Sequence, residues 1–207
     1  MKLIGSPTSP FVRKVRVYLA ETGTACDFQA VDAWQPDAAL QGIAPLGKVP
    51  VLVRDDGPAL FESNLVLEYL DSLRPEAGRL LPPAGEARWT VMRWQALAQG
   101  LIDSVVVRVL ESRRDAAQRS ATILTREEKR MGRALDALEA GIAGREWIAT
   151  ERLSLADVVL GVALQYIDFR DPHDWRGARP ALAVWCARVT ARPSYQQTLP
   201  PGFTPHA

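Results

Sequence analysis

The chain has 207 residues, 47% of them hydrophobic, so it can bury one sizeable core or two small cores packed together. Its 25 lysines and arginines nearly balance 24 aspartates and glutamates, and a net charge of +1 argues against binding to nucleic acid or to an anionic membrane surface. No apolar run approaches the roughly 20 residues that span a bilayer, and the first ten residues lack the apolar segment of a secretory signal. We therefore expect a cytoplasmic protein.

The N-terminal third alternates short strands with helices. Residues 2–5 form an apolar run that ends in a turn, and apolar side chains at helical spacing predict a helix from Pro10 to Glu21. Strands are predicted at 28–31, 49–54 and 59–61, the last two flanking a turn at 55–58. Ser63 is the expected N-cap of a helix over 65–73.

From about residue 76 the pattern changes to helices alone. A linker rich in Pro, Gly and Ala at 76–85 precedes helices predicted at 86–114, 125–143, from 154 onward and at 179–191, with an irregular tail after them. Ser154 and Asp157 form a capping box, so we expect both side chains to be structural. The predicted organisation is a domain at 1–75, a linker at 76–85 and an all-helical domain at 86–207.

Few other side chains suggest chemistry. Cys26 and Cys186 lie far apart, and the two histidines have no metal-ligand spacing, so no metal site is predicted. Arg13, Lys14 and Arg16 form a basic strip on the first helix, a pattern that is usually solvated or faces another subunit.

Four motifs follow one another in the chain: Ser9-Pro10-Phe11 at the first turn, Gly-Lys-Val-Pro-Val-Leu at 47–52, Phe-Glu-Ser-Asn at 61–64 and the capping box at 154–157. In this order and spacing the chain resembles the cytosolic glutathione transferase superfamily over nearly its whole length, and most of all its serine-type bacterial members. The resemblance implies a thioredoxin-like α/β domain followed by an all-helical domain, glutathione as co-substrate without a metal, and a homodimer.

By this resemblance, Ser9 is the residue whose hydroxyl faces the glutathione sulfur. A thiol with a pKa near ~8.5 is only a few per cent thiolate at neutral pH, and a hydroxyl donor beside a helix N-terminus stabilises that anion. Ser9 would also serve as the N-cap of the helix, and a slip of one or two residues would bring Ser6 or Thr8 to the sulfur instead. Serine cannot form a mixed disulfide, so thiol–disulfide exchange is disfavoured.

The second motif resembles the family's cis-proline element. There Val49 presents its backbone to the cysteinyl part of glutathione, while a trans Pro50 at a strand start is the alternative. Lys48 either pairs with the glycine carboxylate of the tripeptide or is a solvated charge.

The third motif resembles the pair that holds the γ-glutamyl end of glutathione. Glu62 would bind the ammonium group, and Ser63 with the helix N-terminus would bind the α-carboxylate. The loop at Trp34 and Gln35 is expected to add a contact to the tripeptide.

The resemblance predicts a glutathione transferase that attacks an apolar electrophile held by the helical domain. Leu101 and Val105 are first of all core residues by their spacing, and with Tyr166 they are candidates for the electrophile wall. The alternative is a non-catalytic relative, similar to stringent-response proteins, that keeps the fold as a binding or interaction module.

Overall fold

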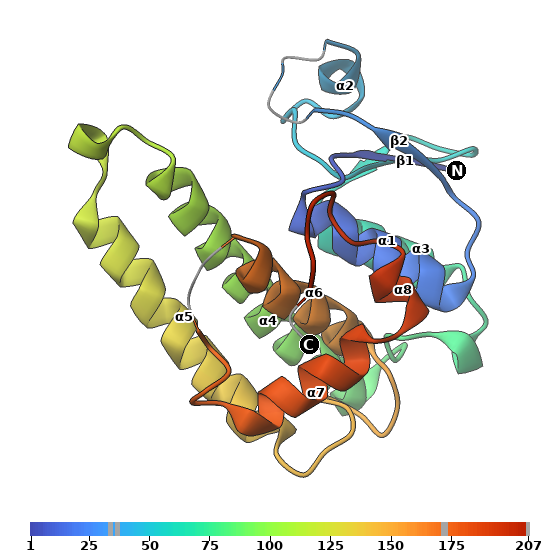
Figure 1. The fold of residues 1–207 in the computed structure, drawn as a ribbon. Helices are drawn as coiled ribbons and strands as arrows, with labels where there is room; N and C mark the ends of the chain where they lie inside the picture. Colours follow the sequence, from blue (N-terminus) through green and yellow to red (C-terminus); the bar gives the residue numbers. More distant parts are fainter. Residues whose placement is uncertain (33–34, 36–37, 171–173, 206–207) are drawn as a thin grey trace. The chain divides into compact units, whose positions relative to one another are not determined.

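Among the residues described in the computed structural model (1–32, 35, 38–170 and 174–205), four short strands form one mixed sheet in the order β2-β1-β3-β4 (Figure 1). The strands are β1 (Lys2–Gly5), β2 (Asp27–Ala30), β3 (Val51–Val53) and β4 (Leu60–Phe61). β1 is parallel to β2 and antiparallel to β3, which is antiparallel to β4. A mixed sheet of this kind, with helices on it and a helical C-terminal part, confirms the predicted fold class.

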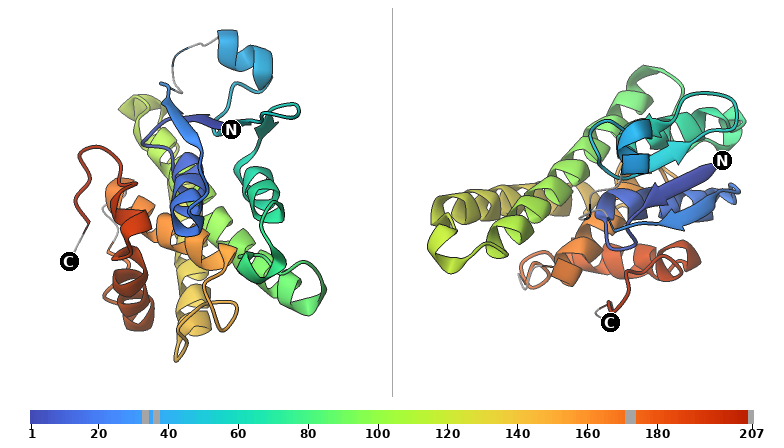
Figure 2. Two further views of the ribbon diagram at one scale, coloured as in Figure 1. Left: turned by 90° about the vertical axis from the view of Figure 1, so that its right-hand side faces the viewer. Right: turned by 90° about the horizontal axis from the view of Figure 1, so that it is seen from above.

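Helices cover both faces of the sheet. α1 (Pro10–Thr22) and α3 (Ser63–Ser72) lie on one face, and the short α2 (Ala38–Ile43) lies on the other (Figures 1 and 2). α2 contributes Leu40 to a cluster with Ile4 and Val51 of the sheet. The sequence did not predict α2, because six residues are too short for a periodic signal. A Cβ on Gly5 would lie 2.4 Å from a methyl carbon of Val12, so glycine lets β1 approach α1 closely.

The C-terminal segment returns to this N-terminal unit. The structure groups Met1–Leu81 with Arg192–Phe203, which contains the short helix α8 (Pro193–Gln196), whereas the sequence placed 86–207 in one helical domain with an irregular tail. The guanidinium of Arg13 donates to the carbonyls of Thr198 (3.1 Å) and Tyr195 (3.3 Å). This contact joins residues far apart in the sequence, so no local sequence pattern could predict it.

The basic strip on α1 was predicted to face solvent or another subunit, and for two of its three residues this is wrong. Arg13 is 3% exposed and Lys14 is fully buried, whereas Arg16 is half-buried with its guanidinium 4.5 Å from the ring centre of Phe28. Burial of the first two is possible because both donate hydrogen bonds inside the unit.

The other unit comprises Pro82–Ala191 and the residues from Thr204 onward. Its longer helices in the described part of the chain are α4 (Gly85–Ser112), α5 (Ala121–Ile142), α6 (Leu155–Arg170) and α7 (Pro180–Thr190). Every residue of α6 from Leu155 to Ile167 is buried, so this helix forms the centre of the unit. The predicted capping box is confirmed, since the Asp157 carboxylate accepts from the Ser154 backbone N–H at 2.9 Å. A second bond, from the Ile148 N–H at 2.9 Å, confirms that Asp157 is structural.

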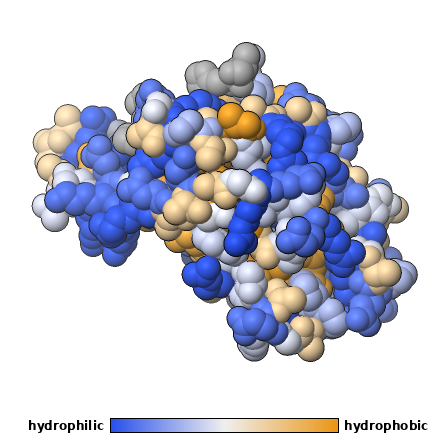
Figure 3. Space-filling model, turned by 90° about the horizontal axis from the view of Figure 1, so that it is seen from below, coloured by the Kyte–Doolittle hydropathy of each residue, from blue (hydrophilic) through white to orange (hydrophobic). Residues whose placement is uncertain are grey.

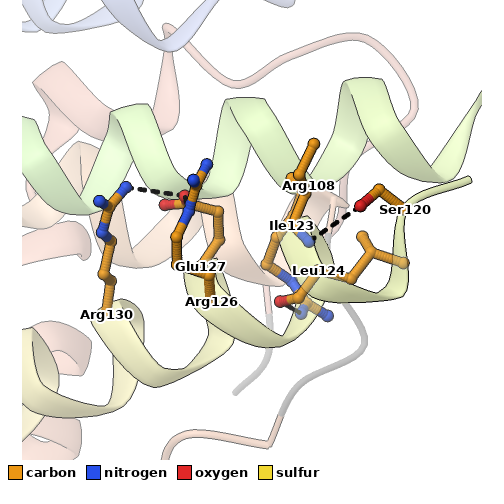
Figure 4. A network of polar contacts seen from close by, with 7 residues as sticks. All are labelled: Arg108, Ser120, Ile123, Leu124, Arg126, Glu127 and Arg130. Carbon is orange, nitrogen blue, oxygen red and sulfur yellow. Dashed lines mark hydrogen bonds and ion pairs between the residues drawn. The ribbon is translucent and has the colours of Figure 1, made fainter.

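Polar contacts join α4 to α5 near their connection, which includes the short 3-10 turn Ala116–Gln118 (Figure 4). Ser120 caps α5 by accepting from the Ile123 N–H at 3.3 Å, so α5 begins four residues before the predicted start. Arg108 donates to the Leu124 carbonyl at 3.1 Å. Burial alone would raise the pKa of Glu127, but hydrogen bonds from Arg126, Arg130 and Ser104 outweigh it and lower that pKa.

The predicted linker also has local structure. Residues Glu76–Gly78 form a 3-10 turn, and the buried carboxylate of Asp71 accepts from the N–H groups of Leu80 (2.8 Å) and Leu81 (3.0 Å). Tyr18 donates to the same carboxylate at 3.0 Å. Asp71 therefore holds the chain that leaves α3 against α1.

No helix among the described residues is long and apolar enough to cross a membrane. On the face shown in Figure 3, hydrophilic side chains separate the apolar ones into small groups.

Candidate active site

The register of the sheet brings three of the sequence motifs to one end of it. Ile4 pairs with Val51, and Val51 pairs with Phe61 across antiparallel strands. Three segments therefore meet at the same end of the strands: the turn after β1, the chain before β3 and the chain after β4. These are the segments with Ser9, with Val49-Pro50 and with Glu62-Ser63, which lie far apart in sequence.

Ser9 lies at the junction of the first turn and α1. Its backbone is extended, and its Oγ accepts from the Val12 N–H at 3.4 Å, so Ser9 is the N-cap of α1. A hydroxyl that accepts at its oxygen still has its O–H to donate. The cap role and the predicted sulfur-facing role are therefore compatible. The two rival hydroxyls, of Ser6 and Thr8, lie 3.2 Å apart and bond to each other.

The Val49–Pro50 peptide bond is cis, which confirms the geometry that the resemblance implied. Pro50 is buried and Val49 is partly exposed, so the side of the backbone before the proline reaches the surface of the unit. Lys48 is exposed beside it, and its pairing with a carboxylate stays a prediction.

Glu62 has an unusual backbone conformation, and its carboxylate accepts several hydrogen bonds. Its φ is 74°, which makes it the non-glycine residue with positive φ in the described part of the chain. The carboxylate accepts from the N–H of Asn64 (3.0 and 3.1 Å), the N–H of Leu65 (3.1 Å) and the Ser63 hydroxyl (3.2 Å). An acid at a helix start is favoured by the partial positive charge there.

The N-cap of α3 is therefore Glu62, and the prediction that Ser63 caps this helix is wrong. The reason is the left-handed backbone at Glu62, which turns its carboxylate across the helix start and leaves Ser63 as the first helical residue. Ser63 is 2% exposed, and its hydroxyl is within reach of the same carboxylate.

Comparison with known proteins decides the family. The family model for the glutathione S-transferase N-terminal domain matches residues 3–78, and the model for the glutathione S-transferase C-terminal domain matches residues 121–188. The uncharacterized GST-like protein YibF of Escherichia coli K12 is 36% identical over 202 residues, covering 97% of this chain and 99% of that protein. The chain belongs to the glutathione S-transferase superfamily.

Solved structures of superfamily members agree over the full length. A glutathione S-transferase from Methylobacillus flagellatus with glutathione bound is 36% identical, with a TM-score of 0.91 over 96% of this chain and 98% of that one. Another, from Methylobacterium radiotolerans in complex with glutathione sulfonate, is 32% identical, with a TM-score of 0.90 over 100% and 97% of the two chains.

The candidates for the electrophile wall of this glutathione S-transferase family member lie in the helical unit. Leu101 is 1% exposed, Val105 is fully buried and Tyr166 is 8% exposed, so all three are part of the core of that unit. Burial raises the pKa of Tyr166, while Arg170 and Arg113 act in the opposite sense. Their contact with a substrate stays a prediction.

The remaining predictions concern the loop contact to the tripeptide, a metal site and Cys26. Trp34 and both histidines lie outside the described residues, so the loop contact to the tripeptide stays a prediction. Within the described part of the chain, no cluster of His, Cys, Asp and Glu could hold a metal ion. Burial raises the pKa of the Cys26 thiol, which disfavours its thiolate form.

Sequence reasoning missed two polar residues beside the site. Asn64 stands out in the sequence only as a member of its motif, yet its side chain donates to the Glu62 carboxylate at 3.3 Å. Lys14 was predicted to lie at the surface, yet its ammonium donates to Asn64 Oδ1 at 2.6 Å. No signal in the sequence identified the second, because the contact between α1 and α3 is set by the tertiary structure.

Proposed function

We propose that this chain is a glutathione transferase that uses the serine hydroxyl of its first turn to stabilise the glutathione thiolate. The observation that carries the proposal is the convergence of Ser9, cis Val49-Pro50 and Glu62-Ser63 at one end of the sheet. Each supplies the group that one part of the tripeptide needs. Full-length similarity to structures with bound glutathione and glutathione sulfonate supports the same assignment.

Glu62 and Ser63 hold the γ-glutamyl end in this proposal. Hydrogen bonds from the start of α3 hold the Glu62 carboxylate in one orientation, so it can accept from the ligand ammonium. The Ser63 hydroxyl, which donates to Glu62 at 3.2 Å, turns to the incoming α-carboxylate. The backbone of Val49 pairs with the cysteinyl part, and Lys48 with the glycine carboxylate.

Ser9 then acts on the sulfur. Its O–H donates to the thiolate, and the N-terminus of α1 adds partial positive charge. Each unit of pKa depression corresponds to about 1.4 kcal/mol of stabilisation of the anion. The bound thiolate supplies the nucleophile, and the helical unit contributes the site for an apolar electrophile. Family membership favours a homodimer in the cytoplasm.

Retention on immobilised glutathione tests the binding half of this proposal. We expect the wild type to be retained and eluted by free glutathione. Glu62→Ala and Ser63→Ala should pass through, because each loses a charge-assisted contact of about 1.5–3 kcal/mol. Glu68→Ala, an exposed glutamate on the same helix, is the matched control and should be retained. A wild type that passes through contradicts the proposal.

Turnover of a chlorodinitrobenzene reporter tests the other half. Conjugation with saturable dependence on glutathione is the expected result. Retention on the resin without turnover of this or other electrophiles would favour the non-catalytic alternative, because that alternative keeps the binding site and lacks the chemistry.

A further inference from the structure

Lys14 is a charged side chain at a position where an apolar side chain would cost less free energy to bury. It is fully buried on α1, among the largest completely buried side chains of the described chain. Removing an ammonium from water is costly unless hydrogen bonds and opposite charge compensate it. Its Nζ donates to Asn64 Oδ1 at 2.6 Å, a short, charge-assisted bond across to the first turn of α3.

This bond determines which way the Asn64 amide points. An ammonium has donors only, so Asn64 must present its oxygen to Lys14. The amide nitrogen then faces the Glu62 carboxylate, to which it donates at 3.3 Å. Removal of the ammonium weakens the preference for this orientation over a flipped amide, which would set an oxygen against the carboxylate.

The charge of Lys14 also matters once a ligand is present. The γ-glutamyl end of glutathione has one ammonium and one carboxylate, so it adds no net charge to Glu62, and the occupied site would be left with one negative charge. Lys14 supplies positive charge from the buried side, with one amide between it and Glu62. Positive charge near a carboxylate lowers the free-energy cost of removing that carboxylate from water.

We propose that Lys14 is a positioning residue for the γ-glutamyl subsite, which orients Glu62 through Asn64 and makes the chain selective for thiols that carry a γ-glutamyl group. The inference rests on the proposed glutathione function. Lys14 does not touch the ligand, and its effect is confined to one end of the tripeptide. A general role in folding would instead affect binding of the whole tripeptide, so the two roles can be told apart by experiment.

The test compares two thiols by competition calorimetry on the full chain. Glutathione has the γ-glutamyl group, and cysteinylglycine is the same molecule without it. We expect Lys14→Met to weaken glutathione binding by about 10- to 100-fold, the range for one lost charge-assisted contact. Binding of cysteinylglycine should change by less than about threefold, which is within the usual effect of a distant substitution. Arg16→Met, two residues along the same helix, is the control and should alter neither.

Asn64→Ala provides an independent arm, and it carries the test if Lys14→Met does not fold. It should lower the preference for glutathione in the same way, and the double variant should be no worse than Lys14→Met, because the two residues act in series. Equal weakening of both thiols, or an unchanged preference for glutathione, overturns the inference. A wild type that shows no preference for glutathione instead overturns the proposed γ-glutamyl subsite, and the role of Lys14 with it.

Discussion

At the scale of single residues, the hydroxyl of Ser9 shows how one group can serve structure and chemistry together. Its oxygen accepts from the Val12 N–H at 3.4 Å, a long contact that leaves the O–H available as a donor. Accepting a hydrogen bond polarises a hydroxyl and makes it a better donor. The cap is therefore no argument against the proposed role at the sulfur.

Ser9→Ala should raise the pKa of bound glutathione by about one unit, because one hydrogen bond to the anion is lost while the helix N-terminus stays. Thiolate absorbance of the saturated complex, titrated against pH, measures this. Ser6→Ala and Thr8→Ala are the matched controls, since their hydroxyls bond to each other. An unchanged titration in Ser9→Ala, with a shift in either control, would move the role along the turn.

At the scale of elements, α1 is held from its buried side by α8. Glu21 and Arg192 form a bidentate pair with both N–O distances at 2.7 Å, and Ser194 donates to the same carboxylate. Burial alone would raise the pKa of Glu21, but the bonds from Arg192 and Ser194 outweigh it and lower that pKa. Because α1 begins directly after Ser9 and includes Lys14, this clamp helps to hold the helix on which the site depends.

The lowered pKa has a consequence for stability against pH. A carboxyl whose folded pKa lies below its unfolded value of 4.5 contributes its full stabilisation above that pH and loses it as the pH falls through the folded pKa. We expect Glu21→Gln to lower the free energy of unfolding by about 2 kcal/mol at pH 7, less than for a fully buried pair because Arg192 is 39% exposed.

Urea unfolding at pH 7 and at pH 3 measures the effect. The difference between wild type and Glu21→Gln should shrink in acid, because below about pH 4.5 the carboxyl takes up a proton in the unfolded chain before it does so in the folded one. Asp56→Asn, in the exposed turn between β3 and β4, should differ from wild type by less than about 0.5 kcal/mol at either pH. A difference that grows in acid would contradict the assignment.

At the scale of the whole molecule, the chain passes out of its N-terminal unit and later comes back to it. It leaves that unit after Leu81 and returns at Arg192. Tyr195 is fully buried there, and the Arg13 guanidinium donates to the carbonyls of Tyr195 and Thr198. The segment Arg192–Phe203 is thus part of the unit that holds the candidate site.

Removal of residues 192–207 should therefore destabilise the N-terminal unit more than the helical one, which loses only the residues after Phe203. It takes these partners away from Arg13 and Glu21, at a cost of several kcal/mol. Hydrogen exchange should show faster exchange in α1 and little change in α5. Equal loss of protection in both helices would show that the truncation unfolds the chain as a whole.

Local patterns were enough for much of the fold. Periodicity located α1, α4, α6 and α7 to within a few residues, and the capping box at Ser154 gave the start of α6, because these features depend on neighbours in the sequence. They failed at the six-residue α2, at the four-residue α8 and at the start of α3. At the start of α3, the backbone of Glu62 has a positive φ that few non-glycine residues adopt, and the cap is therefore Glu62 and not Ser63.

What the sequence by itself determined was the set of chemical groups. A serine before a helix, a Val-Pro step before a strand and a Glu-Ser pair before another helix are local motifs, and their order is enough to indicate glutathione chemistry. The tertiary structure alone decided how they meet, because convergence at one sheet edge follows from strand register. It also decided that Lys14 is buried against Asn64, since the charge of a side chain does not say which neighbours will remove it from water.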